Sequence, residues 1–267
     1  MPEGPEVKHI GESLAKNVSS KQITDIKILS GRYLKKPLPG LDYAIANLPL
    51  DIVGVGVHGK FIYWITRNDI FLYNTLGMTG EWSLEETKHS RVEVKLDDTS
   101  IFFNDQRNFG TLKFVEGRSN LIQKLTSLGP DLLSENISDQ KFIERLRAKD
   151  KWSIAKGLMD QSVVAGIGNY VKAEALWRAR ISPHRLIGDI EDEKLAMLRK
   201  CCQEVLISSY SHGGASIKNY RRPDGTQGQY TSRFAVYNQR EDPDGNQVVK
   251  EATTDGRTTH WVPTVQI

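Results

Sequence analysis

The sequence predicts an α+β protein in which an N-terminal antiparallel β-sandwich precedes a helical domain. Two observations carry this prediction. Between residues 23 and 115 the chain is rich in Ile, Val, Phe and Tyr and is interrupted by turns such as His58-Gly59, which is typical of many short strands. Beyond Gly129-Pro130-Asp131 the apolar residues recur at helical spacing instead, so the architecture changes there.

The first domain is expected to begin with a helix, because Val7, Ile10 and Leu14 form one apolar face and Pro5 lies near its start. A brief helix is expected over 121–128. The strands expected between these helices share β-branched and aromatic residues and span 23–29, 51–57, 61–66, 70–73, 91–96, 101–104 and 111–115.

The second part is expected to hold four helices followed by a small β element. The helices are predicted over 139–149, 154–161, 169–179 and 191–210, and the strands over 234–237, 247–251 and 257–262. The resulting organisation is a sandwich domain over 1–128, a hinge over 129–138, a helical domain over 139–230 and a terminal hairpin domain over 231–267.

Composition indicates an ordinary soluble protein with a real core, since 39% of the 267 residues are hydrophobic and 26% are charged. Residues 1–150 carry equal numbers of acidic and basic side chains, so the net charge of +3 resides in 151–267 and suggests a basic patch there. Cys201 and Cys202 are adjacent, which is typical of reduced thiols, and no signal or membrane-spanning run is present. An intracellular location is expected, in the cytoplasm or nucleoid of a bacterium or the nucleus of a eukaryote.

The first six residues are the most informative stretch for chemistry. Removal of Met1 makes Pro2 an N-terminal secondary amine, which can attack a carbonyl-like carbon and form a permanently charged iminium. An α-amino group titrates near neutrality, and Glu3 and Glu6 could transfer protons beside it. The alternative is structural: Pro5 starts a helix and the acids favour its dipole. On these residues alone the structural interpretation is favoured.

Three further features point toward DNA. In Gly166-Ile167-Gly168-Asn169 the glycines permit a tight turn, and Asn169 is expected to cap a helix whose N–H groups a phosphate could approach. Lys60 follows Gly59 at a hairpin tip and could bind a phosphate. Met78, Arg107 and Phe109 are loop residues of the kinds that enter a base stack. The structural alternatives are an ordinary turn, a solvated lysine and core residues.

Seven motifs, taken in order, change this balance. They are PEGPEV at the terminus, HGK at 58–60, LGMTG at 76–80, DQRNFG at 105–110, LGPDLL at 128–133, LMDQ…GIGNY…EALWR at 158–178 and GRTT at 256–259. Together they resemble the Fpg/Nei family (formamidopyrimidine-DNA glycosylase/endonuclease VIII) of base-excision repair enzymes, over essentially the whole chain.

The resemblance implies a bifunctional DNA glycosylase and AP lyase that needs no cofactor. Pro2 would attack C1′ of a flipped, oxidised nucleotide, Glu3 would protonate the sugar ring oxygen, and Glu6 would assist elimination. The resemblance also implies DNA-binding residues and residues that fill the gap left by the flipped base. The DNA-binding residues are Lys60, Asn169, Arg257 and Lys218, and Lys60 would also have a catalytic role. The gap-filling residues are Met78, Arg107 and Phe109.

The C-terminus departs from the family. Many members end in a four-cysteine zinc finger, but both positions of its last cysteine pair are valine here, Val262 and Val265, and no first pair is present. A zincless finger with no metal ligand is therefore expected. Apolar packing of Phe234, Val236, Val248, Trp261 and Val262 would hold it, and Arg257 would keep a phosphate contact. The alternative, a remnant of a dead finger, is less favoured because Arg257 and its strand pattern persist.

The leading functional hypothesis is removal of oxidised pyrimidines and hydantoins by a Nei-like monomer, followed by β,δ-elimination. The expected partner is duplex DNA with an oxidised base or abasic site, single-stranded DNA being a further candidate, and no membrane. One alternative is Fpg-like specificity for oxidised purines such as 8-oxoguanine and formamidopyrimidines, which the length of the loop over 215–230 favours. Others are a lesion-binding protein without catalysis and an unrelated β/helical DNA-binding protein.

Overall fold

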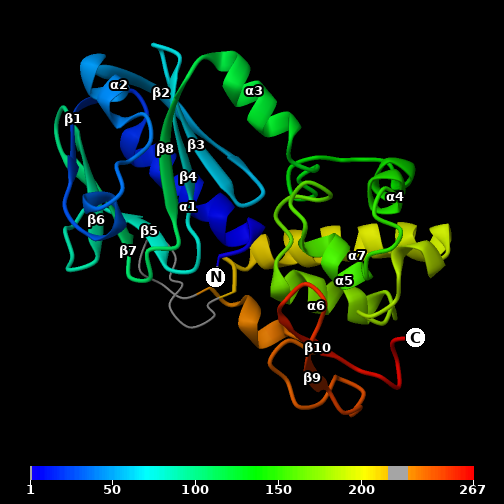
Figure 1. Cartoon of the computed structure of the whole chain (residues 1–267). Coiled ribbons are helices and arrows are strands. Elements are labelled where there is room, and N and C mark those ends of the chain that lie inside the picture. Colours follow the sequence, from blue (N-terminus) through cyan, green and yellow to red (C-terminus); the bar gives the residue numbers. More distant parts are fainter. Residues whose placement is uncertain (1, 216–227) are drawn as a thin grey trace. The chain divides into compact units, whose positions relative to one another are not determined.

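The computed structural model describes residues 2–215 and 228–267, whose elements form two compact units. One unit contains Pro2 and residues 6–126, and the other contains residues 3–5, 127–215 and 228–267 (Figure 1). The first unit is built mainly of strands and the second mainly of helices, which confirms the α+β class. No helix among the described residues is long and apolar enough to cross a membrane.

The first unit holds one eight-stranded antiparallel sheet with the order β5-β7-β6-β1-β2-β3-β4-β8. Its strands are β1 (Gln22–Ile28), β2 (Leu50–His58), β3 (Phe61–Thr66), β4 (Ile70–Thr75), β5 (Gly80–Ser83), β6 (Ser90–Leu96), β7 (Ser100–Asp105) and β8 (Thr111–Glu116). Its shorter elements are the 3-10 turn η1 (Gly31–Leu34) and the helices α2 (Leu41–Ala46) and α3 (Arg118–Thr126).

The sheet folds over on itself, which confirms the predicted sandwich. Trp82 on β5 contacts Trp64 on β3 and Phe103 on β7, with ring centroids 5.1 and 5.3 Å apart. Its indole N–H also donates to the Asn74 Oδ1 on β4 at 3.0 Å. β5 stands at one end of the strand order and β4 near the other, so these contacts require two facing layers with the core between them.

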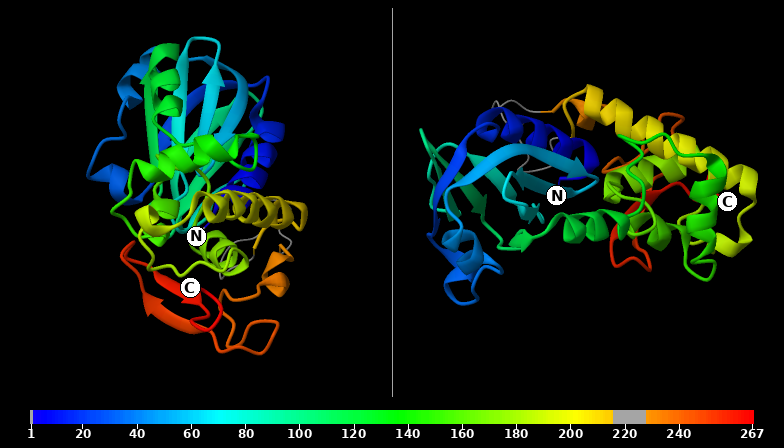
Figure 2. Two further views of the ribbon diagram at one scale, coloured as in Figure 1. Left: turned by 90° about the vertical axis from the view of Figure 1, so that its right-hand side faces the viewer. Right: turned by 90° about the horizontal axis from the view of Figure 1, so that it is seen from above.

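Helix α1 (Gly4–Val18) packs against this sheet, because its apolar residues belong to the same buried core as those of the strands (Figure 2). Val7, Leu14 and Val18 recur on its buried face, as the spacing predicts. The approach is close because Gly11 has no side chain; a Cβ there would lie 2.2 Å from the Val57 Cγ2. The helix carries the N-terminal residues, so its packing decides where Pro2 and Glu6 are held.

The second unit contains four helices, two 3-10 turns and a hairpin among its described residues. They are α4 (Asp139–Arg147), α5 (Ile154–Met159), α6 (Asn169–Arg178), η2 (Ile187–Asp189), α7 (Asp192–Ser211), η3 (Tyr230–Arg233), β9 (Val249–Ala252) and β10 (Thr258–Trp261). Ser138 and Ser153 cap α4 and α5, each accepting a hydrogen bond from a backbone N–H at 3.2 Å. α6 and α7 lie side by side (Figure 2), joined by the Tyr170 and Ser209 hydroxyls.

The strand predicted over 234–237 is wrong. The N–H groups of Ala235, Val236 and Tyr237 all donate to the Glu174 carboxylate of α6, at 2.9, 3.0 and 2.8 Å. Backbone groups that bind a carboxylate cannot join a strand ladder, so the β-favouring residues here form a loop instead. Desolvation raises the pKa of the Glu174 carboxyl above its ordinary value, although the three N–H groups oppose the shift.

Candidate active site and DNA interface

Glu3 is bound to the start of helix α6. The residue is 2% exposed, and its carboxylate accepts hydrogen bonds from the backbone N–H of Tyr170 at 2.9 Å and of Val171 at 3.2 Å. The Gly4 N–H donates to the Gly166 carbonyl at 2.9 Å, which fixes the chain beside it. Free N–H groups and the helix dipole attract an anion at this position. Glu3 therefore binds two of the N–H groups at the start of α6 that the sequence predicted to be open to a phosphate.

Gly168 makes this contact possible. A Cβ built on Gly168 would lie 2.2 Å from the Glu3 Cδ and 2.5 Å from its Oε1, so any side chain at 168 would displace the carboxylate. Gly168 is also the N-cap of α6, and the predicted cap, Asn169, is its first helical residue. The glycines of the G-I-G-N motif indicated a close approach to the backbone. What approaches is Glu3.

Pro2 and Glu6 flank Glu3 along the chain. Pro2 is the residue before Glu3 and is buried. Glu6 lies in the first turn of α1 and is 1% exposed. Lys60 lies at the predicted place, in the two-residue turn between β2 and β3, where His58 pairs with Phe61 and Gly59 takes the φ of 58° that the turn requires.

Met78, Arg107 and Phe109 come together on the first unit, as predicted. The Arg107 guanidinium donates to the Met78 sulfur at 3.2 Å and lies 4.9 Å from the centre of the Phe109 ring. The Phe109 side chain is 53% exposed, so the core alternative is wrong for that residue. An exposed aromatic that a guanidinium covers is available to stack on a base.

Asp105 shapes the loop that carries this trio, a role that the sequence reading missed. Its carboxylate accepts hydrogen bonds from the backbone N–H of Arg107 at 3.2 Å and of Gly110 at 2.7 Å, and from the Thr79 hydroxyl at 2.5 Å. The only signal in the sequence was an Asp before a polar turn, where such side chains bind nearby N–H groups.

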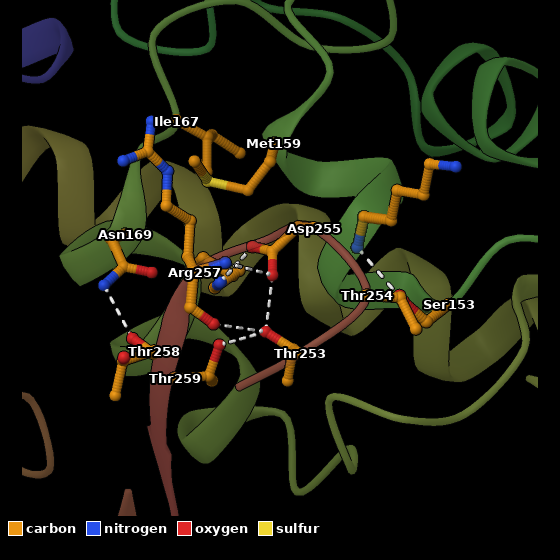
Figure 3. A network of polar contacts seen from close by, with 12 residues as sticks. Ser153, Met159, Ile167, Asn169, Thr253, Thr254, Asp255, Arg257, Thr258 and Thr259 are labelled. Atoms are coloured by element: carbon orange, nitrogen blue, oxygen red, sulfur yellow. Dashed lines mark hydrogen bonds and ion pairs between the residues drawn. The ribbon is translucent and has the colours of Figure 1, made fainter. Parts of the chain in front are cut away.

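Asn169 and Arg257 lie near each other in the second unit. The Asn169 Nδ2 donates to the Thr258 carbonyl of β10 at 2.9 Å, and Arg257 is the preceding residue, in the turn between β9 and β10. Figure 3 shows the exposed Arg257 side chain leaving this turn on the side of Asn169 and Ile167. The Asn169 amide and the Arg257 guanidinium, both of which can bind phosphate, therefore lie where the start of α6 contacts the β9–β10 turn. Lys218 lies outside the described residues.

The hairpin is held by an apolar cluster in which both valines of the former cysteine positions take part. Val236, Val248 and Val262 are buried with Ala173 of α6, and Val265 packs against them. Two predicted members, Phe234 and Trp261, are not part of this cluster. Phe234 instead contacts the rings of Tyr170, Tyr230 and Tyr237. Trp261 alternates to the other side of β10, where its indole donates to the Glu251 carboxylate.

A buried carboxylate, Asp242, closes the loop before β9. It accepts hydrogen bonds from the N–H groups of Asp244 and Asn246, at 3.0 and 2.8 Å, and from the Trp177 indole at 3.2 Å. Desolvation opposes its ionisation, but the Asn246 side-chain amide, which donates to the carboxylate at 3.0 Å, and these other donors prevail and hold the pKa of Asp242 below its ordinary value. Within residues 2–215 and 228–267, no three His, Cys, Asp or Glu side chains gather as metal ligands would.

We expect His260 to make the stability of this hairpin depend on pH. Burial, with Lys250 and Lys172 nearby, lowers the pKa of His260 from 6.5 to about 4. Between those values the unfolded chain binds a proton and the folded chain does not, so stability is complete above about pH 7 and falls as the pH drops toward 4.

We expect His260→Phe, which keeps the ring packed 4.8 Å from that of Tyr237, to remove part of this dependence. The Tm of the wild type should fall about 5 °C further than that of the variant between pH 7.5 and 4.5, equivalent to about 2 kcal/mol. Thermal unfolding at both pH values measures it. Equal falls in Tm would show that His260 does not carry the effect.

Family models described as the formamidopyrimidine-DNA glycosylase N-terminal, H2TH and C-terminal domains match residues 1–112, 128–221 and 227–267. The chain is 36% identical over 221 residues to a formamidopyrimidine-DNA glycosylase of Thermus thermophilus, covering 80% of this chain and 82% of the relative. It is 32% identical to that of Erythrobacter litoralis, covering 100% of both chains.

Solved structures agree along the whole chain. The crystal structure of the MutM (Fpg) protein of Thermus thermophilus matches with a TM-score of 0.86 and 33% identity, covering 99% of this chain and 98% of that one. A Lactococcus lactis Fpg mutant in complex with Fapy-dG-containing DNA matches with a TM-score of 0.88 and 27% identity, covering 99% of each chain. MutM in complex with DNA containing carbocyclic 8-oxo-G matches with a TM-score of 0.87 and 27% identity, covering 99% of each chain.

Proposed function

We propose a lesion specificity and a set of residue roles for this chain, which belongs to the Fpg/Nei family of base-excision repair DNA glycosylases with AP lyase activity. The substrate is duplex DNA that carries a formamidopyrimidine or another oxidised purine. The observation that carries the residue roles is the Glu3 carboxylate bound at the start of α6, directly after Pro2 in the chain.

The reaction begins at the Pro2 nitrogen once Met1 has been removed. Its lone pair attacks C1′ of the flipped nucleotide, the bond between C1′ and the base breaks, and the departing base takes that electron pair together with the proton that the Pro2 nitrogen releases. Glu3, in its carboxylic acid form, donates a proton to the sugar ring oxygen, so the ring opens and a charged iminium joins Pro2 to the sugar. The iminium draws electrons from C2′, and loss of a proton there expels the 3′ phosphate by β-elimination. Glu6 assists the later proton transfers, δ-elimination expels the 5′ phosphate, and water releases Pro2.

DNA is held by cations and amides that bind backbone phosphates. Lys60, Asn169 and Arg257 have these roles, and Lys218, outside the described residues, is assigned to the region of the flipped base. Met78, Arg107 and Phe109 fill the space that the flipped base leaves, which their contacts with one another and the exposed Phe109 ring support. Binding to phosphates should weaken steeply with salt.

The lesion preference rests on the relatives. Those at 36% and 32% identity are named formamidopyrimidine-DNA glycosylases, and similar structures hold DNA with Fapy-dG or 8-oxo-G. This supports oxidised purines ahead of the oxidised pyrimidines and hydantoins of the leading hypothesis from the sequence. The relatives are bacterial, so we assign the protein to the DNA-containing compartment of a bacterial cell.

Borohydride trapping on duplexes with single defined lesions tests both points. Reduction converts the iminium into a stable covalent adduct, so the yield reports the chemistry directly. Fapy-dG and 8-oxoguanine should be trapped at least about tenfold faster than an oxidised pyrimidine, a difference of about 1.4 kcal/mol in activation free energy. A hydantoin lesion and an abasic site complete the panel.

The panel tests the lesion preference and the catalytic roles separately. Faster trapping of the oxidised pyrimidine would overturn the purine assignment and restore the Nei-like preference. Tight binding with no adduct on any lesion or on the abasic site would contradict the catalytic roles and leave a lesion-binding protein. Removal of Met1 is verified by mass spectrometry before either conclusion is drawn.

A further inference from the structure

The second unit contains a buried ion pair that the proposed chemistry does not use. Lys172 on α6 is paired with Asp255 in the turn between β9 and β10, and the two side chains are 0% and 1% exposed. Desolvation of two charges opposes their attraction, and replacement of such pairs by apolar residues is often neutral for stability. The pair is therefore better explained by the groups that it positions than by a contribution to stability.

On the hairpin side, Asp255 holds the turn that carries Arg257 (Figure 3). One carboxylate oxygen binds Lys172, and the other accepts hydrogen bonds from the Thr253 hydroxyl and from the Arg257 N–H at 3.3 Å. The Arg257 carbonyl accepts hydrogen bonds from the Thr253 N–H at 3.0 Å and from its hydroxyl at 3.1 Å. Both backbone groups of Arg257 are thus fixed, while its side chain is exposed.

On the helix side, Lys172 lies three residues after Asn169, so both project from one face of α6. Asn169 binds the carbonyl of Thr258, just after Arg257. Lys172 binds Asp255, just before the tip. One face of α6 therefore binds the turn on both sides of Arg257. Of the two contacts, the one between Lys172 and Asp255 is buried and charged.

We propose that Lys172 and Asp255 are positioning residues that fix Arg257 against the start of α6, so that Arg257 and Asn169 bind backbone phosphate as one unit. This inference rests on the proposed function, because it assigns these two residues to the DNA-binding step. We assign neither residue a contact with DNA or with the reacting atoms. Their loss lowers affinity and leaves the chemical step intact.

The first experiment separates binding from chemistry. We expect Lys172→Met to raise the Kd for a duplex with an abasic-site analogue about tenfold, while the single-turnover rate at saturating enzyme stays within about twofold of wild type. Because this variant leaves the Asp255 charge buried, Lys172→Met/Asp255→Asn is made beside it. The double variant removes both charges and keeps an acceptor for the turn. Lys200→Met, an exposed lysine on α7, is the control.

The second experiment asks whether the effect passes through Arg257. In an Arg257→Ala background, the double variant should change Kd by less than about twofold, because the group it positions is gone. The salt dependence should agree: the slope of log Kd against log salt should fall by about one in both Arg257→Ala and the double variant. A variant that merely loosened the fold would weaken binding in both backgrounds.

Two outcomes overturn the inference. One is a folded double variant, judged by its Tm, that binds the analogue as wild type does. The other is an equal loss of affinity with and without Arg257. Failure of the proposed function looks different, because the wild type itself would then neither bind the analogue nor form a trapped adduct.

Discussion

Pro2→Gly is expected to eliminate the borohydride-trapped adduct and to slow base release at least about 1000-fold, the largest effect of any single substitution considered. Proline gives an iminium that is charged at every pH, whereas a primary amine gives an imine that must first be protonated to act as an electron sink. Glycine also frees the backbone that the ring holds, so the orientation of the nitrogen is lost as well. Trapping on an abasic duplex and single-turnover base release are the measurements.

A chain with one extra residue before Pro2 is the matched control, since it retains every side chain but converts the amine into an amide. It should lose trapping as completely as Pro2→Gly while its Tm and its affinity for an abasic-site analogue stay near those of the wild type. Substantial trapping by either protein would place the nucleophile elsewhere.

Gly168→Ala should have the second largest effect, a loss of base release of at least about 100-fold, equivalent to about 2.7 kcal/mol. The added Cβ would occupy the position of the Glu3 carboxyl group, which it would approach to 2.2 Å at Cδ. The carboxylate would then leave the N–H groups of Tyr170 and Val171. An abasic site has already lost its base, and its sugar ring opens to the aldehyde without the enzyme, so trapping on it should fall far less.

Gly54→Ala is a matched control, because a Cβ on that residue of β2 meets nothing within 4 Å. It should behave as wild type. Glu3→Gln completes the set: if Gly168 acts only through Glu3, adding Gly168→Ala to Glu3→Gln should cost little more. Normal base release by a folded Gly168→Ala protein would show that Glu3 does not need this contact.

The strands of the sandwich could be predicted because each carries its own local signal. β3 spans Phe61–Thr66 as expected, and the other predicted strands of this sheet differ by a few residues at their ends. β5 was missed because Gly80–Ser83 is short and contains one apolar residue. Its place is decided by pairing with β7 and by Trp82 in the core. Over residues 234–237 a strand was predicted where none forms. The β-favouring side chains there give no information about the distant Glu174 carboxylate that binds their N–H groups.

What the sequence by itself determined is the inventory of chemistry: a proline amine next to two acids, the order of the motifs, and valines where cysteines would bind a metal. These are covalent facts. Only the tertiary structure decided that Glu3 binds N–H groups 167 and 168 residues away, and that Lys172 pairs with Asp255 across 83 residues. A periodic pattern reports which face of its own element is buried, whereas contacts of this length depend on how whole elements pack.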